Sequence, residues 1–165
     1  NQFSTLALDT YFDFVKKVDD QKEVLSISDE TVDLLLKPYI LAIIAPDFDD
    51  PMTLRFGPKY DYDTQQTMTP VDDYRTRLQD PLVMESLGRS EENRSAISDY
   101  LPTAEDSFLA LDIVEGIGGD IGVNILKQYV EGFREEDKGR MRSFVRGELS
   151  ARDTDFSKQA LQAIA

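Results

Sequence analysis

Prolines and helix-capping residues divide this chain into short stretches, and this punctuation limits the fold more than any other feature. The chain holds seven prolines in 165 residues. Proline lacks a backbone donor and clashes with the preceding turn, so helices tend to end before it or begin on it. Asp80-Pro81 is a typical helix start, and Ser28-Asp29-Glu30 adds acids near the positive end of a helix dipole. The sequence therefore predicts many short helices.

Apolar residues recur at helical spacing within most of these stretches. The segment 28–45 is apolar nearly all round, so we expect it at the centre of the core, with a kink or break near Lys37 caused by Pro38. The predicted fold is all-α, an irregular bundle of about seven or eight short helices forming one domain over residues 1–165. The helices are expected near residues 5–18, 28–45, 80–88, 90–101, 103–114, 123–133, 135–149 and 155–164, and Thr69-Pro70 is a further helix-start signal before Asp80-Pro81.

Residues 46–69 interrupt the helical pattern. Four of the prolines and Gly57 fall at or next to this stretch, which we expect to be an irregular loop within the domain. Apolar residues alternate on both sides of Gly57-Pro58-Lys59, which allows a small β-hairpin near residues 53–62.

The chain is strongly acidic, with a formal charge of −14 at pH 7. A surface of this sign repels nucleic acid and anionic membranes, so neither is expected as a direct partner. No apolar run approaches the roughly 20 residues that span a bilayer, so we expect a soluble protein, with the cytoplasm as the default compartment. The partner we expect is another protein, and this charge suits a basic one.

The chain contains neither histidine nor cysteine. This excludes Ser-His-Asp and Cys-His mechanisms within the chain, together with thiolate zinc sites and disulfides. We predict no cofactor. Whether the chain is an enzyme stays open, but the absence of these residues argues against it.

Carboxylates offer two weak candidate metal sites. Asp112 and Glu115 are three residues apart on a predicted helix, with Asp120 nearby, and carboxylate oxygens suit Mg²⁺ or Ca²⁺. An acidic stretch of the loop supplies the other set, and both sets also fit ordinary solvated or turn-forming acids. The loop candidates are Asp47, Asp49 and Asp50.

Two further clusters lie in the second half of the chain. Gly116, Gly118 and Gly119 fall between two predicted helices, where backbone amides could bind an anion or simply form a helix-to-helix joint. The joint is favoured, because a lone glycine cluster is a weak signal. The other cluster is a ridge of bases spaced four apart, which could receive an anion or an acidic partner, or pair internally with nearby glutamates. Its members are Arg134, Lys138, Arg142 and Arg146.

These features lead to two functional hypotheses. The first is a non-enzymatic protein–protein interaction module, of inhibitor, immunity-like or adaptor type, that acts through its acidic surface. The second is a divalent-cation-dependent enzyme or small-ligand-binding domain that uses the carboxylates beside the glycine-rich joint. No motif matches a known family closely enough to decide between them, and the oligomeric state cannot be read from the sequence.

Overall fold

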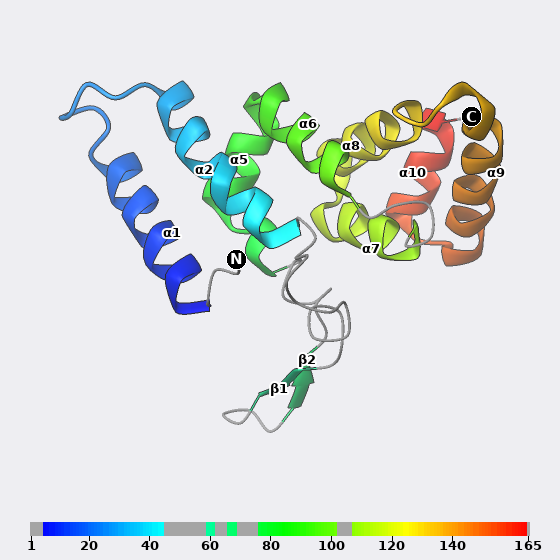
Figure 1. Cartoon of the computed structure of the whole chain (residues 1–165), viewed down its shortest axis with the longest axis horizontal. Helices are drawn as coiled ribbons and strands as arrows, with labels where there is room; N and C mark the ends of the chain where they lie inside the picture. The colour runs from blue at the N-terminus through cyan, green and yellow to red at the C-terminus, as the bar shows by residue number, and fades with distance from the viewer. Residues whose placement is uncertain (1–4, 45–58, 62–65, 69–75, 102–106, 165) are drawn as a thin grey trace.

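The computed structural model describes residues 5–44, 59–61, 66–68, 76–101 and 107–164. Helices dominate these ranges, which confirms the predicted all-α fold (Figure 1). None of the helices in these ranges is both long and apolar enough to cross a membrane. The helices are α1 (Thr5–Asp20), α2 (Asp29–Ile44), α5 (Pro81–Arg89), α6 (Glu91–Tyr100), α7 (Ser107–Ile117), α8 (Gly119–Glu131), α9 (Glu135–Arg152) and α10 (Asp155–Ile164).

A two-stranded hairpin is present, but not at the predicted position. Strand β1 (Lys59–Asp61) pairs antiparallel with β2 (Gln66–Met68), and Tyr60 lies opposite Thr67. The sequence pattern places the turn at Gly57-Pro58-Lys59, but Lys59 is the first residue of β1. The first half of the predicted hairpin, residues 53–58, lies outside the described residues. Alternation alone identified Tyr60 as a strand residue but chose the wrong partner strand for it.

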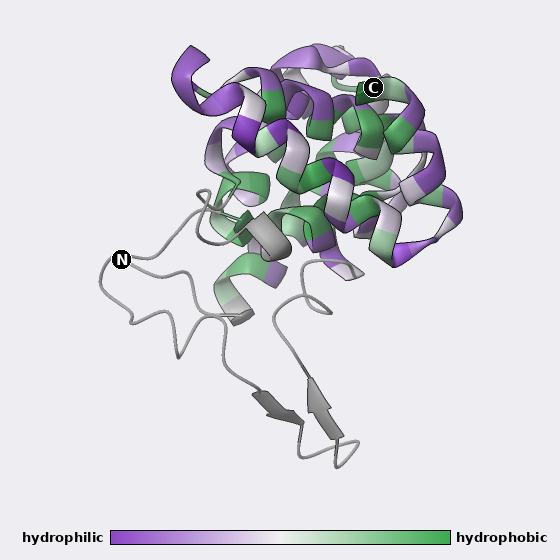
Figure 2. Ribbon diagram, turned by 90° about the vertical axis from the view of Figure 1, so that its right-hand side faces the viewer, coloured by the Kyte–Doolittle hydropathy of each residue, from purple (hydrophilic) through white to green (hydrophobic). Residues whose placement is uncertain are grey.

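Six helices lie side by side in a row. Along the row the order is α1, α2, α6, α8, α10 and α9, with α5 packed beside α2 and α6, and α7 packed against α8 (Figure 1). Hydrophobic and hydrophilic residues alternate along the helix ribbons (Figure 2), and the buried hydrophobic side chains of the row form its core. Helices α1 and α9 therefore form the two ends of the row.

One hydrophobic core cluster connects every helix of the row. It includes fully buried side chains from all six helices of the row, with Val145 as the contribution of α9. One domain over residues 1–165 stays a prediction. Fully buried members of the core cluster include Val15 in α1, Leu36 and Ile40 in α2, Ile97 in α6, Ile125 and Leu126 in α8, and Ala160 in α10.

A kink or a break was predicted near Lys37, and the structure excludes the break, because helix α2 runs through Pro38 without ending. Pro38 removes the bond that its backbone nitrogen would have made to the carbonyl of Leu34. Both Pro38 and Leu34 are exposed, so water can satisfy that carbonyl and the helix tolerates the proline. As expected, α2 contributes buried residues such as Leu36 and Ile40 to the core cluster, while Leu34 and Pro38 on its outer side stay exposed.

The junctions between helices are short and follow the predicted capping signals closely. The Asp80 carboxylate accepts a hydrogen bond from the backbone N–H of Leu82, and Pro81 occupies the first turn. Ser90 is the C-cap of α5 and also the N-cap of α6, where its hydroxyl accepts from the N–H of Asn93 at 3.1 Å. Gly118 alone separates α7 from α8 and has a φ of +75°.

The glycines of α8 and α9 differ sharply in their surroundings. A Cβ on Gly122 would lie 2.5 Å from the backbone oxygen of Val114 and 3.0 Å from the ring of Phe156, so this glycine permits the close packing of α8 against α7 and α10. A Cβ on Gly139 or Gly147 would meet nothing within 4 Å. Gly139 and Gly147 therefore lower the stability of the helix through the backbone entropy of glycine, although a larger side chain would fit at both positions.

This contrast gives a stability prediction. Gly139→Ala and Gly147→Ala should each raise the free energy of unfolding by about 0.5–1 kcal/mol, because alanine restricts the unfolded chain and fits the helix. Gly122→Ala should lower it by more than about 2 kcal/mol, because the added methyl overpacks the junction. Urea unfolding followed by circular dichroism measures all three, and equal effects at Gly122 and Gly139 would contradict the packing described here.

A candidate partner-binding hollow between helices α2 and α6

The first turns of α2 and α6 bring carboxylates together on one side of the molecule. Each helix begins with a serine cap followed by two acids: Ser28-Asp29-Glu30 and Ser90-Glu91-Glu92. The acids are favourable there because they lie at the positive end of the helix dipole. Since α2 and α6 are neighbours in the row, the two acidic starts come to lie close together.

An open hollow of about 410 Å³ lies between these two helix starts. Five carboxylates line it, but only one cationic side chain does, so the cavity is strongly negative. Its lining residues are Asp29, Glu30, Asp33, Leu34, Arg89, Ser90, Glu91, Glu92 and Asn93. We call this feature the acidic hollow.

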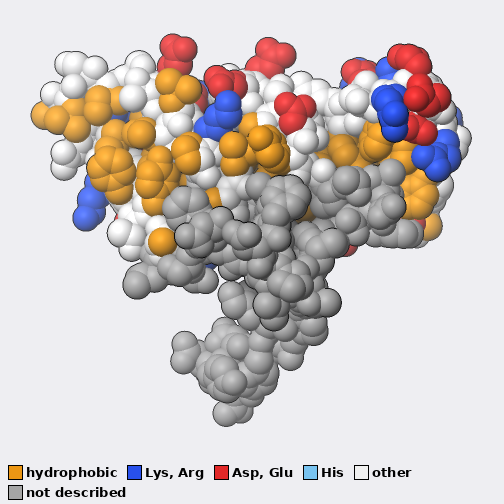
Figure 3. Space-filling model, viewed as in Figure 1, with side chains coloured by type: hydrophobic (Ala, Val, Ile, Leu, Met, Phe, Trp, Pro, Cys, Tyr) orange, Lys and Arg blue, Asp and Glu red, His pale blue; other side chains and the backbone are white. Residues whose placement is uncertain are grey.

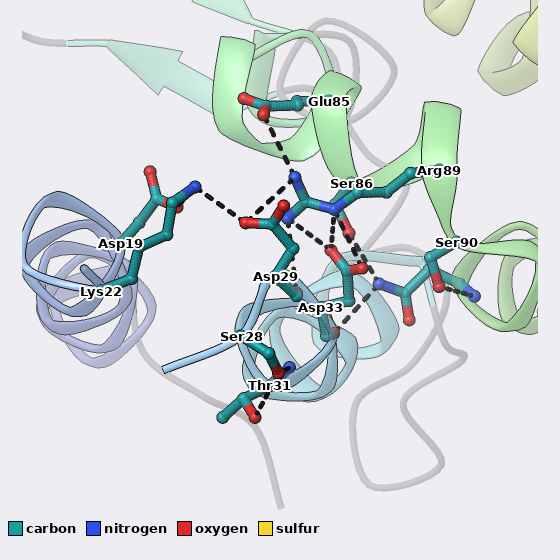
Figure 4. A network of polar contacts seen from close by, with 11 residues as sticks. Asp19, Lys22, Ser28, Asp29, Thr31, Asp33, Glu85, Ser86, Arg89 and Ser90 are labelled. Carbon is teal, nitrogen blue, oxygen red and sulfur yellow. Dashed lines mark hydrogen bonds and ion pairs between the residues drawn. The ribbon is translucent and has the colours of Figure 1, made fainter. Parts of the chain in front are cut away.

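The base of the acidic hollow is a nearly buried ion pair between Arg89 and Asp33 (Figure 4). The Arg89 Nε lies 3.0 Å from both carboxylate oxygens of Asp33, and its Nη2 lies 2.8 Å from Oδ1. The hydrogen bond to Asp33 raises the pKa of the Arg89 guanidinium. The Asp33 side chain is only 11% exposed, so this pair is a fixed part of the structure.

Asn93 completes the connection between the helices. Its Nδ2 donates to the backbone oxygen of Asp33 at 3.0 Å and to the hydroxyl of Ser86 at 2.9 Å. Asn93 and Ser86 are both buried. One amide therefore joins α2, α5 and α6, and it holds the two acidic helix starts at a fixed separation.

Two lysines neutralise part of the rim. Lys22 lies 2.8 Å from Asp29, and Lys37 lies 2.8 Å from Glu92 (Figure 4 shows the first pair). The hydrogen bond from Lys22, followed by the charge of Arg89, lowers the pKa of the Asp29 carboxyl. Glu30 and Glu91 are exposed and have no cationic partner among the described residues. Two carboxylates in the lining of the acidic hollow thus have no cationic partner within the described part of the chain.

Leu34 adds an apolar contact beside these charges. It lines the acidic hollow from α2, one helical turn after Glu30, and is 54% exposed. A leucine this exposed next to uncompensated carboxylates is suited to a partner side chain with an aliphatic stem and a cationic end, such as lysine or arginine.

The carboxylates predicted as a metal site have another role. The Arg152 Nη1 lies 2.6 Å from Asp112 and 2.8 Å from Glu115, and its Nε donates to Glu148 at 3.3 Å. Asp120 lies apart from them and accepts a hydrogen bond from Gln159. Among the described residues, no group of three or more carboxylates is arranged to hold a metal ion. Asp112 and Glu115 instead tie α7 to the end of α9.

The remaining predicted site residues are dispersed. Asp47, Asp49 and Asp50 lie outside the described residues. Gly116 is inside α7, Gly118 is the cap before α8, and Gly119 is the first residue of α8, so this cluster is a helix-to-helix joint with Asp120 in the following turn. The glycine-rich joint is thus shorter than predicted, because α8 starts at Gly119 rather than near Val123.

Two of the four cations of the predicted basic ridge form ion pairs with neighbouring acids. Arg134 precedes α9 as its N-cap and lies 3.7 Å from both Glu136 and Asp137, and Lys138 bonds to Glu135 at 3.0 Å. Only Arg142 and Arg146 are exposed on α9 without an ion pair to another described residue. Internal pairing thus uses half of the predicted anion-binding cations.

The sequence analysis did not single out the residues of the acidic hollow. A signal was present, since the pattern of a serine followed by two acids occurs at both residue 28 and residue 90. What the pattern could not supply was that α2 and α6 pack side by side, a fact that depends on the buried faces of both helices.

Comparison of the chain with protein-family models, curated proteins and solved structures finds no match. The function of the chain is therefore inferred from the geometry of the molecule.

The Arg89–Asp33 pair yields a stability prediction. Arg89→Met should lower the free energy of unfolding by about 2–3 kcal/mol, because it leaves a nearly buried carboxylate without its cation. Asp33→Asn in the same chain should recover part of this loss. Lys37→Met is the matched control at an exposed pair and should change stability by less than about 1 kcal/mol. If urea unfolding gives the same loss of stability for Arg89→Met and Lys37→Met, the Arg89–Asp33 pair stabilises the fold no more than an exposed ion pair does.

The lowered pKa of Asp29 yields a prediction about pH. A carboxyl whose pKa in the folded state lies below its ordinary value of 3.8 stabilises the fold above that value, and the contribution is lost as the pH falls through the folded pKa. Lys22→Met should move the pKa of Asp29 back toward 3.8 and should destabilise the protein at neutral pH more than in strong acid. NMR titration of the Asp29 carboxyl and urea unfolding at several pH values measure both effects. Lys127→Met, on the exposed side of α8, should leave the Asp29 titration unchanged.

Proposed function

We propose that this chain is a non-enzymatic interaction module that binds a basic segment of another protein in the acidic hollow. The observation that carries the proposal is that Glu30 and Glu91 line the cavity without a cationic partner among the described residues, while Asp33 is already paired with Arg89. An incoming lysine or arginine would find carboxylates free to pair with it, rather than carboxylates it would have to take from Arg89.

The shape of the acidic hollow fits a side chain better than a flat charged surface would. A volume of about 410 Å³ accommodates one long cationic side chain together with ordered water. The aliphatic part of that side chain would pack on Leu34 while its charge reaches Glu30 or Glu91. Because Asn93 and Arg89 hold the walls in place, little ordering would be needed on binding.

The net charge of the chain assists this role at long range. A charge of −14 attracts a basic partner during diffusion and repels nucleic acid and other acidic surfaces. Such steering raises association rates more than final affinity, so the specificity would come from the contacts inside the acidic hollow. Catalysis is the weaker alternative, because the chain has no histidine or cysteine and Asp112 and Glu115 are engaged by Arg152.

The test uses a defined basic peptide rich in lysine and arginine, titrated into the protein by calorimetry. The variant Glu30→Gln/Glu91→Gln should weaken binding by about tenfold, since each lost ion pair with the partner costs on the order of 0.5–1 kcal/mol. Leu34→Ser should weaken it further. Binding should also fall as salt is added. Capture from a lysate on the wild-type protein, with the double variant as reference, then identifies the natural partner.

A matched control keeps the change in net charge the same. Glu131→Gln/Asp155→Asn removes two exposed carboxylates from the end of α8 and the start of α10. If this variant weakens peptide binding as much as Glu30→Gln/Glu91→Gln does, the protein attracts cations through net charge alone and the acidic hollow is not the binding site. Absence of binding at low salt would contradict the whole proposal.

A further inference from the structure

Helix α1 forms one end of the row, and its outer side carries an exposed phenylalanine. α1 packs against α2, where the Tyr11 hydroxyl donates to the backbone oxygen of Leu35 at 2.6 Å. Phe14 lies next to Tyr11, with ring centroids 6.4 Å apart, but is 53% exposed. Hydrophobic side chains gather over α1 and α2 at this end of the molecule (Figure 3). Large apolar side chains that stay exposed together mark an interaction surface.

The charges beside Phe14 are arranged in a particular order. Asp13 precedes Phe14, and Lys17 follows Asp13 by one helical turn, so all three lie on the outer side of α1. Asp13 and Lys17 are exposed, and no ion pair joins either to another described residue. The outer face of α1 therefore presents an acid and a base one helical turn apart, with the aromatic ring beside them around the helix.

This order is complementary to itself when the helix is reversed. In a symmetric pair of antiparallel α1 helices, Lys17 of each copy lies at the height of Asp13 of the other. Phe14 then falls near the twofold axis, on the other side of the contact from the charges, where it meets Phe14 of the second copy. Both ion pairs and the aromatic contact form at once, which neither a parallel pair nor an uncharged partner would allow.

We propose that the outer face of α1 is a dimer interface that binds a second copy of this chain antiparallel, with Phe14 at its centre and Asp13 paired across it with Lys17. No residue of α1 lines the acidic hollow, and α2 lies between α1 and α6 in the row, so this interface is independent of the function proposed above. The overall charge of −14 opposes association, but salt at physiological concentration screens that repulsion beyond about 8 Å. The paired contacts at α1 act within that distance.

The test is sedimentation equilibrium of the whole chain at physiological ionic strength over a wide concentration range. The wild type should change reversibly from one chain to two as its concentration rises. Phe14→Asp should raise the dissociation constant of the dimer by at least about tenfold. Phe144→Asp, at the exposed phenylalanine of α9 at the other end of the row, should leave it unchanged. Circular dichroism confirms that each variant stays folded.

Charge exchange tests the antiparallel arrangement itself. Asp13→Lys places lysine against lysine across the interface, and Lys17→Asp places aspartate against aspartate, so each variant alone should dimerise weakly. A mixture of the two variants restores both ion pairs and should form a heterodimer, as should the double variant with itself. A wild type that remains a single chain at every concentration overturns the proposal, and so does a mixture that forms no heterodimer.

Discussion

The arrangement of this molecule depends on how Asn93 and Arg89 hold helix α2. Asn93 of α6 donates a hydrogen bond to the backbone of Asp33, and Arg89 of α5 pairs with its carboxylate. One residue of α2 is thus bound by side chains from two neighbouring helices. Buried polar groups are tolerated only when they are satisfied, which makes this a connection with a single favourable geometry. Hydrophobic contacts are less directional than these hydrogen bonds and ion pairs. The polar connection fixes the register between α2 and α6, and the acidic hollow follows from that register.

Local features of the fold were well predicted, because the physics that determines them is local. A cap at Asp80 before Pro81, a start at Ser90 and a start near Asp155 each depend on residues within one turn, and the structure has helices beginning at these places. The sequence left a kink or a break open at Pro38, since the outcome depended on whether the carbonyl of Leu34 faces water, which is a property of the packed molecule. The partner of strand β1 was misread for the same kind of reason.

The candidate sites show the same division more clearly. Asp112 and Glu115 were correctly expected to share a helix face, but Arg152, 37 and 40 residues away, occupies them. Glu30 and Glu91 are far apart in the chain and were ordinary first-turn acids until α2 and α6 were placed side by side. A set of acids in one helix turn says little about function, because the partner that neutralises them, or fails to, comes from elsewhere in the sequence.

The double capping role of Ser90 limits which mutations the chain can accept during evolution. Because it closes α5 and opens α6, no spare residue separates the two helices. One inserted residue there would turn α6 by roughly 100° relative to α5 and carry Glu91 and Asn93 away from α2. Substitutions can accumulate on either helix, but insertions and deletions at this junction cannot. Eight residues, 21–28, separate α1 from α2, so no single residue caps both helices. Insertions and deletions are better tolerated there.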